Sequence, residues 1–328
     1  MSLPPVEVPA GAMRFNSDSQ KLEYYDGAQW LQVSTKETLT GGPRGLFGGG
    51  YTPTLSNTID YILISTQGDA IDFGDLTTAR ISHNSSCASS TRGVWAGGRQ
   101  VPAPAFNIID YVTISSTGNA LDFGDLTGAY YDYAGFSSSV RGVFAGGTVG
   151  YTNIIEYITI SSTGNAQDFG DLQSAKSICA GCASSTRGIV AGGIPATNVI
   201  DYITIASTGN AQDFGDLTQA RFALSGCSSP VRGLFGGGAT PSIVNTIDYI
   251  TISTLGNAFD FGDLSTVSGY RFSCSSPTRG VWAGGNNPAK DNTIEYVTIA
   301  SIGNAINFGD LTSTRAYGGG LSNAHGGL

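Results

Sequence analysis

The chain has 328 residues, of which 12% are charged, and its formal net charge is −9. A net negative charge of this size gives no basic surface for nucleic acid or for an anionic membrane, so we expect neither as a partner. No apolar run approaches the roughly 20 residues of a transmembrane helix, and the start, MSLPPVEVPAG, lacks the basic and apolar regions of a signal peptide. We therefore expect neither membrane insertion nor a secretory leader.

Residues 1–36 are predicted to form a small N-terminal β module. Short runs of strand-forming residues predict three strands, at Met13–Asn16, Lys21–Tyr25 and Gln29–Val33. So few apolar residues do not make a stable core alone, so the module needs a partner. Two interpretations stay open. The module is either a flap packed on the rest of the chain, or a docking module in which Phe15, Tyr24 and Trp30 contact other subunits.

Residues 37–328 consist of six copies of one repeat. The copies begin at Arg44, Arg92, Arg141, Arg187, Arg232 and Arg279. Each copy reads RG-x-x-x-GG, then [ND]-x-I-[DE]-Y-[IV]-x-I, then G-[ND]-A-x-[DN]-FGDL. A period of about 40 to 50 residues with short β-branched and aromatic runs is typical of a β-propeller. No segment has sustained helical periodicity, so we predict an all-β fold with six blades of four strands.

The end of the chain is predicted to close this propeller. A strand-like run follows every FGDL segment, and the last of these runs is Arg315–His325. No full equivalent precedes Arg44, so the Arg44 strand would have a free inner edge. We therefore expect the C-terminal strand to complete the first blade.

The order of arginine, apolar strand, Gly-Gly, variable loop, acidic-Tyr strand and aromatic strand resembles a kelch repeat. The resemblance covers residues 37–328 and implies a kelch-like propeller. The chain departs from kelch in carrying Phe where kelch usually has Trp, at Phe73, Phe123, Phe169, Phe214, Phe261 and Phe308.

Each copy also contains one acid in its acidic-Tyr strand. These acids are Asp60, Asp110, Glu156, Asp201, Asp248 and Glu295. We predict that they form structural ion pairs with the six RG arginines, because a contact made once per copy is unlike a catalytic site. A carboxylate pair for catalysis and a calcium site at the turn Asp168–Asp171 are the alternatives. We expect no catalytic residue, no metal and no cofactor.

Four cysteines recur at one position, five residues before an RG arginine. They are Cys87, Cys182, Cys227 and Cys274, and two other copies have Phe136 and Leu321 there. A position that accepts Cys, Phe or Leu is a buried apolar site, and equivalent residues of different blades are too far apart to form a disulfide. We therefore expect buried, unpaired thiols.

The loops between Gly-Gly and the acidic-Tyr strand vary most between the copies. Variable loops on a rigid scaffold are where binding usually resides. Tyr51, Phe106, Tyr151 and Lys290 are the candidate binding residues, since they could stack on a sugar ring or contact a protein partner. Drift in tolerant surface loops explains the same variation, and both interpretations stay open.

Residues 11–33 resemble a short module of tail-fibre and other appendage proteins of tailed bacteriophages. The motif elements are Arg14-Phe15-Asn16, Leu22-Glu23-Tyr24-Tyr25 and Gly27–Trp30. The resemblance implies a non-enzymatic virion structural protein, such as a tail fibre, appendage or decoration protein, with several copies on each particle. Residues 1–36 would dock to other virion proteins, and the propeller would bind a protein or a host surface glycan or receptor.

Two other functions stay open. One is a cellular kelch-type interaction module. The other is an enzyme acting on polysaccharide, which would need an acidic pair in the central channel or a loop face unlike its sixfold neighbours.

Overall fold

The computed structural model describes residues 8–16, 21–32, 42–101 and 104–328. The chain divides into two compact units, Met1–Thr40 and Gly41–Leu328. All regular secondary structure in the described residues is β-strand, which confirms the prediction of an all-β protein. Within these ranges no helix is long and apolar enough to cross a membrane.

The first unit contains one antiparallel sheet of three strands. They are β1 (Met13–Asn16), β2 (Lys21–Tyr25) and β3 (Trp30–Gln32), in that spatial order. The Asp26 carboxylate accepts hydrogen bonds from the amides of Ala28 and Gln29, both at 2.8 Å, and Gly27 has a φ of +101°. The Asp-Gly pair thus closes the β2–β3 turn, because Gly adopts positive φ without strain.

The second unit contains six antiparallel sheets of four strands. Sheet 1 consists of β27 (Gly319–Ser322), β4 (Arg44–Gly48), β5 (Thr58–Leu63) and β6 (Ile71–Asp75). Sheet 2 consists of β7 (Ser86–Ala88), β8 (Arg92–Ala96), β9 (Ile108–Thr113) and β10 (Leu121–Asp125). Sheet 3 consists of β11 (Ala134–Ser137), β12 (Arg141–Ala145), β13 (Thr152–Thr159) and β14 (Gln167–Lys176).

The remaining sheets follow the same order. Sheet 4 consists of β15 (Ala180–Ala183), β16 (Arg187–Ala191), β17 (Thr197–Thr204) and β18 (Gln212–Arg221). Sheet 5 consists of β19 (Ser225–Ser228), β20 (Arg232–Gly236), β21 (Thr246–Thr251) and β22 (Phe259–Asp263). Sheet 6 consists of β23 (Phe272–Ser275), β24 (Arg279–Asn287), β25 (Ala289–Thr298) and β26 (Ile306–Asp310).

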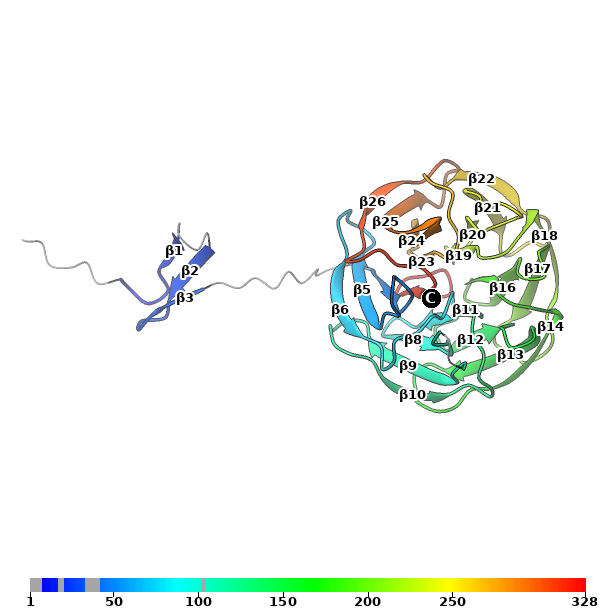
Figure 1. Cartoon of the computed structure of the whole chain (residues 1–328), viewed down its shortest axis with the longest axis horizontal. Helices are drawn as coiled ribbons and strands as arrows, with labels where there is room; N and C mark the ends of the chain where they lie inside the picture. The colour runs from blue at the N-terminus through cyan, green and yellow to red at the C-terminus, as the bar shows by residue number, and fades with distance from the viewer. Residues whose placement is uncertain (1–7, 17–20, 33–41, 102–103) are drawn as a thin grey trace, which may run out of the picture. The chain divides into compact units, whose positions relative to one another are not determined.

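The sheets of the second unit surround a common centre, an arrangement typical of β-propellers (Figure 1). The last strand of each sheet lies at the rim, where β6, β10, β14, β18, β22 and β26 are labelled. The end of the chain returns to the start of the second unit, because β27 pairs with β4 from Gly319↔Gly48 to Ser322↔Gly45. Sheet 1 therefore contains strands from both ends of the unit.

The apolar core lies between neighbouring sheets. One cluster combines Ile189 and Phe214 of sheet 4 with Phe235 and Ile250 of sheet 5. Each FGDL phenylalanine is buried, and Phe214 meets the Tyr202 ring edge to face at a centroid distance of 6.1 Å. Burying such a ring stabilises the fold by about 1.5–3 kcal/mol, and phenylalanine has no polar atom that would need a partner there.

A turn of the next sheet covers the outer edge of each rim strand. In β14, the carbonyls of Phe169 and Asp171 accept hydrogen bonds from Gly209 and Ala211 of sheet 4, both at 2.8 Å. The Asn210 side chain accepts a bond from the Asp171 amide at 3.0 Å. The FGDL and G-[ND]-A motifs are therefore the two sides of one contact, which covers a strand edge that would otherwise be free.

Candidate functional site

The RG arginines join neighbouring sheets. Arg187 of sheet 4 lies 4.8 Å from the ring centroid of Tyr202, and its Nη1 donates to the carbonyl of Ile252, directly after β21 of sheet 5, at 2.9 Å. Arg279 of sheet 6 donates in the same way to Ile64, directly after β5 of sheet 1, at 2.8 Å. The same pair of contacts is made by Arg44, Arg92, Arg141 and Arg232.

The prediction that these arginines pair with the repeated acids is wrong, and strand register gives the reason. In the β16–β17 pair, Arg187 lies opposite Thr204, whereas Asp201 lies opposite Val190. Arg187 and Val190 are an odd number of residues apart, so their side chains point to opposite faces of the sheet. Asp201 shares the face of Val190 and therefore faces away from Arg187.

The acids pair instead with cations that stand in the chain shortly before the first strand of the same sheet; two of these cations, Lys176 and Arg221, end the last strand of the preceding sheet. Arg221 Nη2 lies 2.8 Å from the Asp248 carboxylate, and both side chains are fully buried. Thr218 donates to the same carboxylate from its amide at 3.1 Å and from its hydroxyl at 2.7 Å. The other pairs are Arg80–Asp110, Lys176–Asp201, Arg271–Glu295 and Arg315–Asp60.

The position of most of these cations is regular in the sequence, relative to the FGDL phenylalanine. In four copies a basic residue stands seven residues after the FGDL phenylalanine, at Arg80, Lys176, Arg221 and Arg315. In the segment that leads into sheet 6 this position is Ser268, and Arg271, three residues later, supplies the cation.

Sheet 3 is the exception. The corresponding position is Tyr130, and among the described residues no cation pairs with Glu156. The Glu156 carboxylate accepts a hydrogen bond from the Thr127 hydroxyl at 2.5 Å, and burial raises the pKa of Glu156. The repeated acids are therefore scaffold, but one of the six is held by hydrogen bonds alone.

The recurring cysteine position explains the glycine that follows each RG arginine. A Cβ at Gly233 would lie 2.7 Å from the Cys182 sulfur, and one at Gly93 would lie 2.8 Å from a methyl carbon of Leu321. All five cysteines are free and buried, which confirms the prediction for the four recurring ones and adds Cys179. Burial raises the pKa of Cys179 to about 11, so its thiol stays protonated and unreactive at neutral pH.

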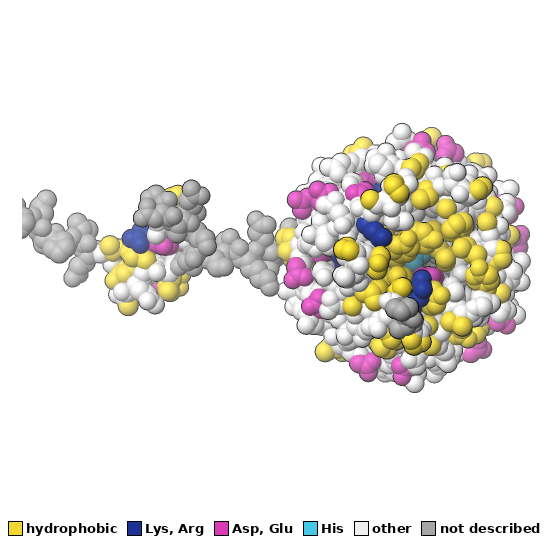
Figure 2. Space-filling view, viewed as in Figure 1, with side chains coloured by type: hydrophobic (Ala, Val, Ile, Leu, Met, Phe, Trp, Pro, Cys, Tyr) yellow, Lys and Arg dark blue, Asp and Glu magenta, His cyan; other side chains and the backbone are white. Residues whose placement is uncertain are grey.

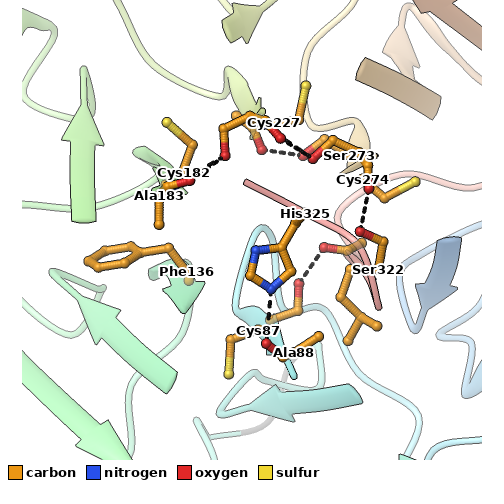
Figure 3. A pocket seen from close by; sticks show the side chains of 18 of the residues that line it. Cys87, Ala88, Phe136, Cys182, Ala183, Cys227, Ser273, Cys274, Ser322 and His325 are labelled. Atoms are coloured by element: carbon orange, nitrogen blue, oxygen red, sulfur yellow. Dashed lines mark hydrogen bonds between the residues drawn. The ribbon is translucent and has the colours of Figure 1, made fainter. Parts of the chain in front are cut away.

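The first strands of the six sheets surround a cavity of about 50 Å³ on the central axis. A water needs roughly 10–15 Å³ by this measure, so the cavity has room for a few waters and not for a sugar. The cysteine thiols point away from it, toward the neighbouring sheets (Figure 3). His325 projects into it, where Nε2 lies 2.9 Å from the Ala88 carbonyl and 3.1 Å from the Ser137 hydroxyl.

His325 is held in one orientation by its neighbours. Its Nδ1 accepts a hydrogen bond from the Gly327 amide at 3.1 Å, so Nε2 carries the proton and donates to Ala88. Burial lowers the pKa of His325, which keeps the ring neutral. The C-terminal residues thus close this end of the axis.

The opposite end of the axis carries a ring of six residues with positive φ, which we name the axial ring. Its members are Asn84, Asp132, Ile178, Ala223, Tyr270 and Tyr317, with φ between 54° and 68°. The amides of Ile178, Ala223, Tyr270 and Tyr317 each donate to the carbonyl of the preceding member, at 2.9–3.0 Å. Positive φ is uncommon outside glycine and persists where the surroundings impose it, and these hydrogen bonds hold four of the six members in place.

The axial ring lies on the side of the variable loops. The residue before each ring member other than Asn84 bridges to the start of a loop, as Tyr131 does to Thr148 and Phe222 to Ala239. The Asn84 side chain reaches across the axis, because its amide donates to the carbonyls of Cys179 at 3.2 Å and Leu224 at 2.8 Å.

Five residues on this side, which we name the axial cluster, break the sixfold pattern: His83, Arg99, Asp132, Tyr270 and Tyr317. The Tyr270 and Tyr317 rings lie 4.3 Å apart, and His83 meets Tyr270 edge to face at 5.4 Å. The Arg99 guanidinium lies 4.7 Å above the ring of Tyr131. On the face shown in Figure 2, hydrophobic side chains gather around a centre where an acidic, a basic and a histidine side chain lie close together.

Burial controls the protonation of the axial cluster. It raises the pKa of Asp132 to about 7, while the charge of Arg99 and the His83 amide act in the opposite direction. It lowers the pKa of His83 to about 3, so the imidazole is neutral at physiological pH. Burial, helped by Tyr317 and Asp132, raises the pKa of Tyr270 to about 12.

The structure brings together only two of the four candidate loop residues. Lys290 Nζ lies 4.7 Å above the ring of Tyr51, which joins the β24–β25 hairpin to the first variable loop. Tyr151 is 44% exposed with a φ of 53°, and Phe106 is half-buried with its amide bonded to the Gly98 carbonyl at 2.7 Å. The axial cluster was missed because only Arg99 lies in a variable loop, and the other four residues belong neither to a repeated motif nor to such a loop.

The candidate docking residues lie on two faces of the first unit. Phe15 and Tyr24 share one face with Met13 and Leu22, because Met13 lies opposite Tyr24 and Phe15 opposite Leu22 in the β1–β2 pair. Trp30 lies on the other face, where the Arg14 guanidinium sits 4.1 Å above its ring and pairs with Glu23 at 2.8 Å.

Comparisons with known proteins leave the family open. A scan against protein-family models finds no match, and a search of curated proteins also finds none. Among the described residues, no group of three or more His, Cys, Asp or Glu side chains could hold a metal ion, at the turn Asp168–Asp171 or elsewhere.

Proposed function

We propose that the six sheets are the blades of a closed, kelch-like β-propeller. The support is that the contacts between sheets 1 and 2 recur between each following pair and again between sheets 6 and 1. Arg279 reaches Ile64 as each RG arginine reaches the next sheet. Gly309 of β26 packs against Gly68 of sheet 1, as Gly170 packs against Gly209. The β27–β4 pairing then acts as the closure.

The exposed apolar face of the first unit is the observation that carries the functional proposal. Met13 is 61% exposed, Phe15 66%, and Leu22 and Tyr24 40% each. A three-stranded sheet is too small to hide such a face within itself, and exposed apolar patches of this kind mark interaction sites. The repeat motifs of the second unit, by contrast, are occupied by contacts between sheets.

From these features we infer a non-enzymatic structural protein of a tailed-phage virion, a tail fibre, appendage or decoration protein. The face formed by Met13, Phe15, Leu22 and Tyr24 docks to other virion proteins. The propeller is displayed, with its variable-loop side free to bind a protein or a host surface glycan. The resemblance of residues 11–33 to phage appendage modules motivates this choice over a cellular interaction module.

The test compares two exposed apolar side chains of equal accessibility. Phe15 in the first unit and Ile302 in the second are both 66% exposed. Particles assembled without the chain are incubated with the purified full-length protein and sedimented. Wild type and Ile302→Ser should co-sediment with the particles, whereas Phe15→Ser should stay in the supernatant. Equal co-sedimentation of both variants would contradict docking through this face, and absence of binding by the wild type would favour the cellular alternative.

The buried acid of the axial cluster is the feature closest to an enzyme site. Glycoside hydrolysis normally uses two carboxylates that flank the scissile bond. The groups that act on the Asp132 carboxyl in the described structure are Arg99 and the His83 amide, and no second carboxylate is among them. This arrangement favours binding over hydrolysis.

A further inference from the structure

The axial cluster occurs once, whereas the FGDL phenylalanines and the RG arginines of the second unit occur in all six sheets. Where sheets 3, 6 and 1 place Asp132, Tyr270 and Tyr317 in the axial ring, sheets 4 and 5 place Ile178 and Ala223. The ring therefore has a polar, aromatic part and an apolar, small part around one axis. Asymmetry of this kind is expected of a binding site, because a scaffold contact would be needed in every sheet.

Several buried polar atoms of the cluster and its neighbours have no hydrogen-bond partner within the described residues. They are both ring nitrogens of His83, Nε of Arg99 and the hydroxyl of Ser82. His83 and Ser82 are fully buried. A buried polar group without a partner destabilises a protein by about 1–3 kcal/mol, so such a group needs a specific explanation. A polar ligand seated on the cluster would supply partners to the groups that border it.

The charges of the cluster select the kind of ligand. Asp132 is 6% exposed, and the positive charge of Arg99 acts on it. Above pH 7, where the Asp132 carboxyl is ionised, a cationic ligand would be repelled by Arg99 and an anionic ligand by Asp132, so a ligand without net charge fits best. The carboxylate accepts hydrogen bonds and the guanidinium donates them, which suits a ligand rich in hydroxyl groups.

The tyrosine pair adds an apolar platform. Tyr270 and Tyr317 are half-buried, and their rings lie at 39° to one another. Tyrosine combines an apolar ring with a polar hydroxyl, so it can cover the C–H face of a sugar and bond its edge. We propose that the axial cluster binds one neutral pyranose ring, stacked on the tyrosine pair and hydrogen-bonded by Asp132 and Arg99. This inference rests on the display function proposed above and specifies its ligand and site.

Two tyrosines on the loop side provide a matched test. Tyr317 and Tyr151 both have positive φ, 68° and 53°, so substitution by alanine changes the backbone preference equally. The full-length protein is titrated with the methyl glycosides of glucose, galactose, mannose and N-acetylglucosamine, with saturation-transfer NMR as the readout. At least one glycoside should bind wild type and Tyr151→Ala, and should bind Tyr317→Ala about tenfold more weakly. Thermal unfolding checks that both variants are folded.

A charge variant separates the proposed chemistry from simple stacking. Asp132→Asn leaves Arg99 without its opposing charge, so this variant should gain binding of methyl glucuronide, an anionic pyranose, relative to methyl glucoside. An unchanged preference would overturn the roles given to Asp132 and Arg99.

Two further results would overturn the site itself. If Tyr151→Ala loses glycoside binding and Tyr317→Ala keeps it, the sugar-binding site lies in the variable loops and not at the axial cluster. Absence of saturation transfer to every glycoside by the wild type would exclude a neutral sugar ligand. Neither result changes the particle co-sedimentation assay, so failure of this inference and failure of the display function are distinguishable.

Discussion

Removing the cation from one buried ion pair should destabilise the second unit strongly. In Arg221→Met the Asp248 carboxylate, fully buried and 2.8 Å from the guanidinium in the wild type, keeps its two Thr218 hydrogen bonds and loses its counter-charge. Leaving one buried charge without its partner costs about 3–5 kcal/mol. For a unit of this size, that corresponds to a fall in melting temperature of roughly 6–10 °C.

The assay is urea and thermal unfolding at neutral pH, followed by circular dichroism, with two companion variants. Arg221→Met/Asp248→Asn removes the unpaired charge and should recover part of the loss. Glu156→Gln is the natural control, because Glu156 has no ion pair among the described residues and burial raises its pKa. It should cost at most about 1 kcal/mol. A loss of less than about 1 kcal/mol in Arg221→Met, the range of exposed ion pairs, would refute the reasoning.

Three further predictions concern other parts of the second unit. Gly233→Ala places a Cβ 2.7 Å from the Cys182 sulfur and should cost about 1–3 kcal/mol in urea unfolding, most of it recovered in Gly233→Ala/Cys182→Ala; no recovery would place the strain elsewhere. Burial raises the pKa of Asp132 from 3.8 to about 7, so the folded state holds the extra proton and the unfolding free energy should fall as pH rises between these values. Asp132 should contribute up to about 1.4 kcal/mol per pH unit to this fall, and the contribution should vanish in Asp132→Asn. Identical pH profiles of the unfolding free energy for wild type and Asp132→Asn would contradict this prediction. Deletion of residues 314–328 removes β27 and the Arg315 partner of Asp60, so stability should fall by more than about 5 kcal/mol, and an unchanged melting temperature would rule out closure by β27.

The strands could be predicted well from the sequence because the same local pattern occurs once in each of the six repeats. The repeated acids and arginines were recognised as scaffold, but their pairing was wrong. Spacing along the chain cannot show that Arg187 and Asp201 face opposite sides of their sheet, since that depends on the register between β16 and β17. The partner of Asp201, Lys176, comes from the preceding repeat, so the pair appears only when neighbouring sheets are considered together.

The axial cluster could not be predicted for a related reason. His83, Asp132 and Tyr317 belong to three different copies, and each is a single departure from the repeat with no motif around it. They meet only because the starts of the first strands converge on one axis, where a ring of backbone hydrogen bonds links successive copies. A repeat makes its common residues conspicuous and leaves the residues that differ without any local signal.

The turns that cover the rim strands keep neighbouring molecules from pairing through their strand edges. An uncovered outer strand would present a row of free amides and carbonyls at the perimeter of every sheet, and two molecules held side by side could then join edge to edge. Here Gly209 and Ala211 of one sheet occupy the carbonyls of Phe169 and Asp171 in the sheet before it, and the same bonds recur around the perimeter. Neighbouring copies on a shared surface could therefore touch through side chains while their backbones stay separate, so close spacing need not lead to aggregation.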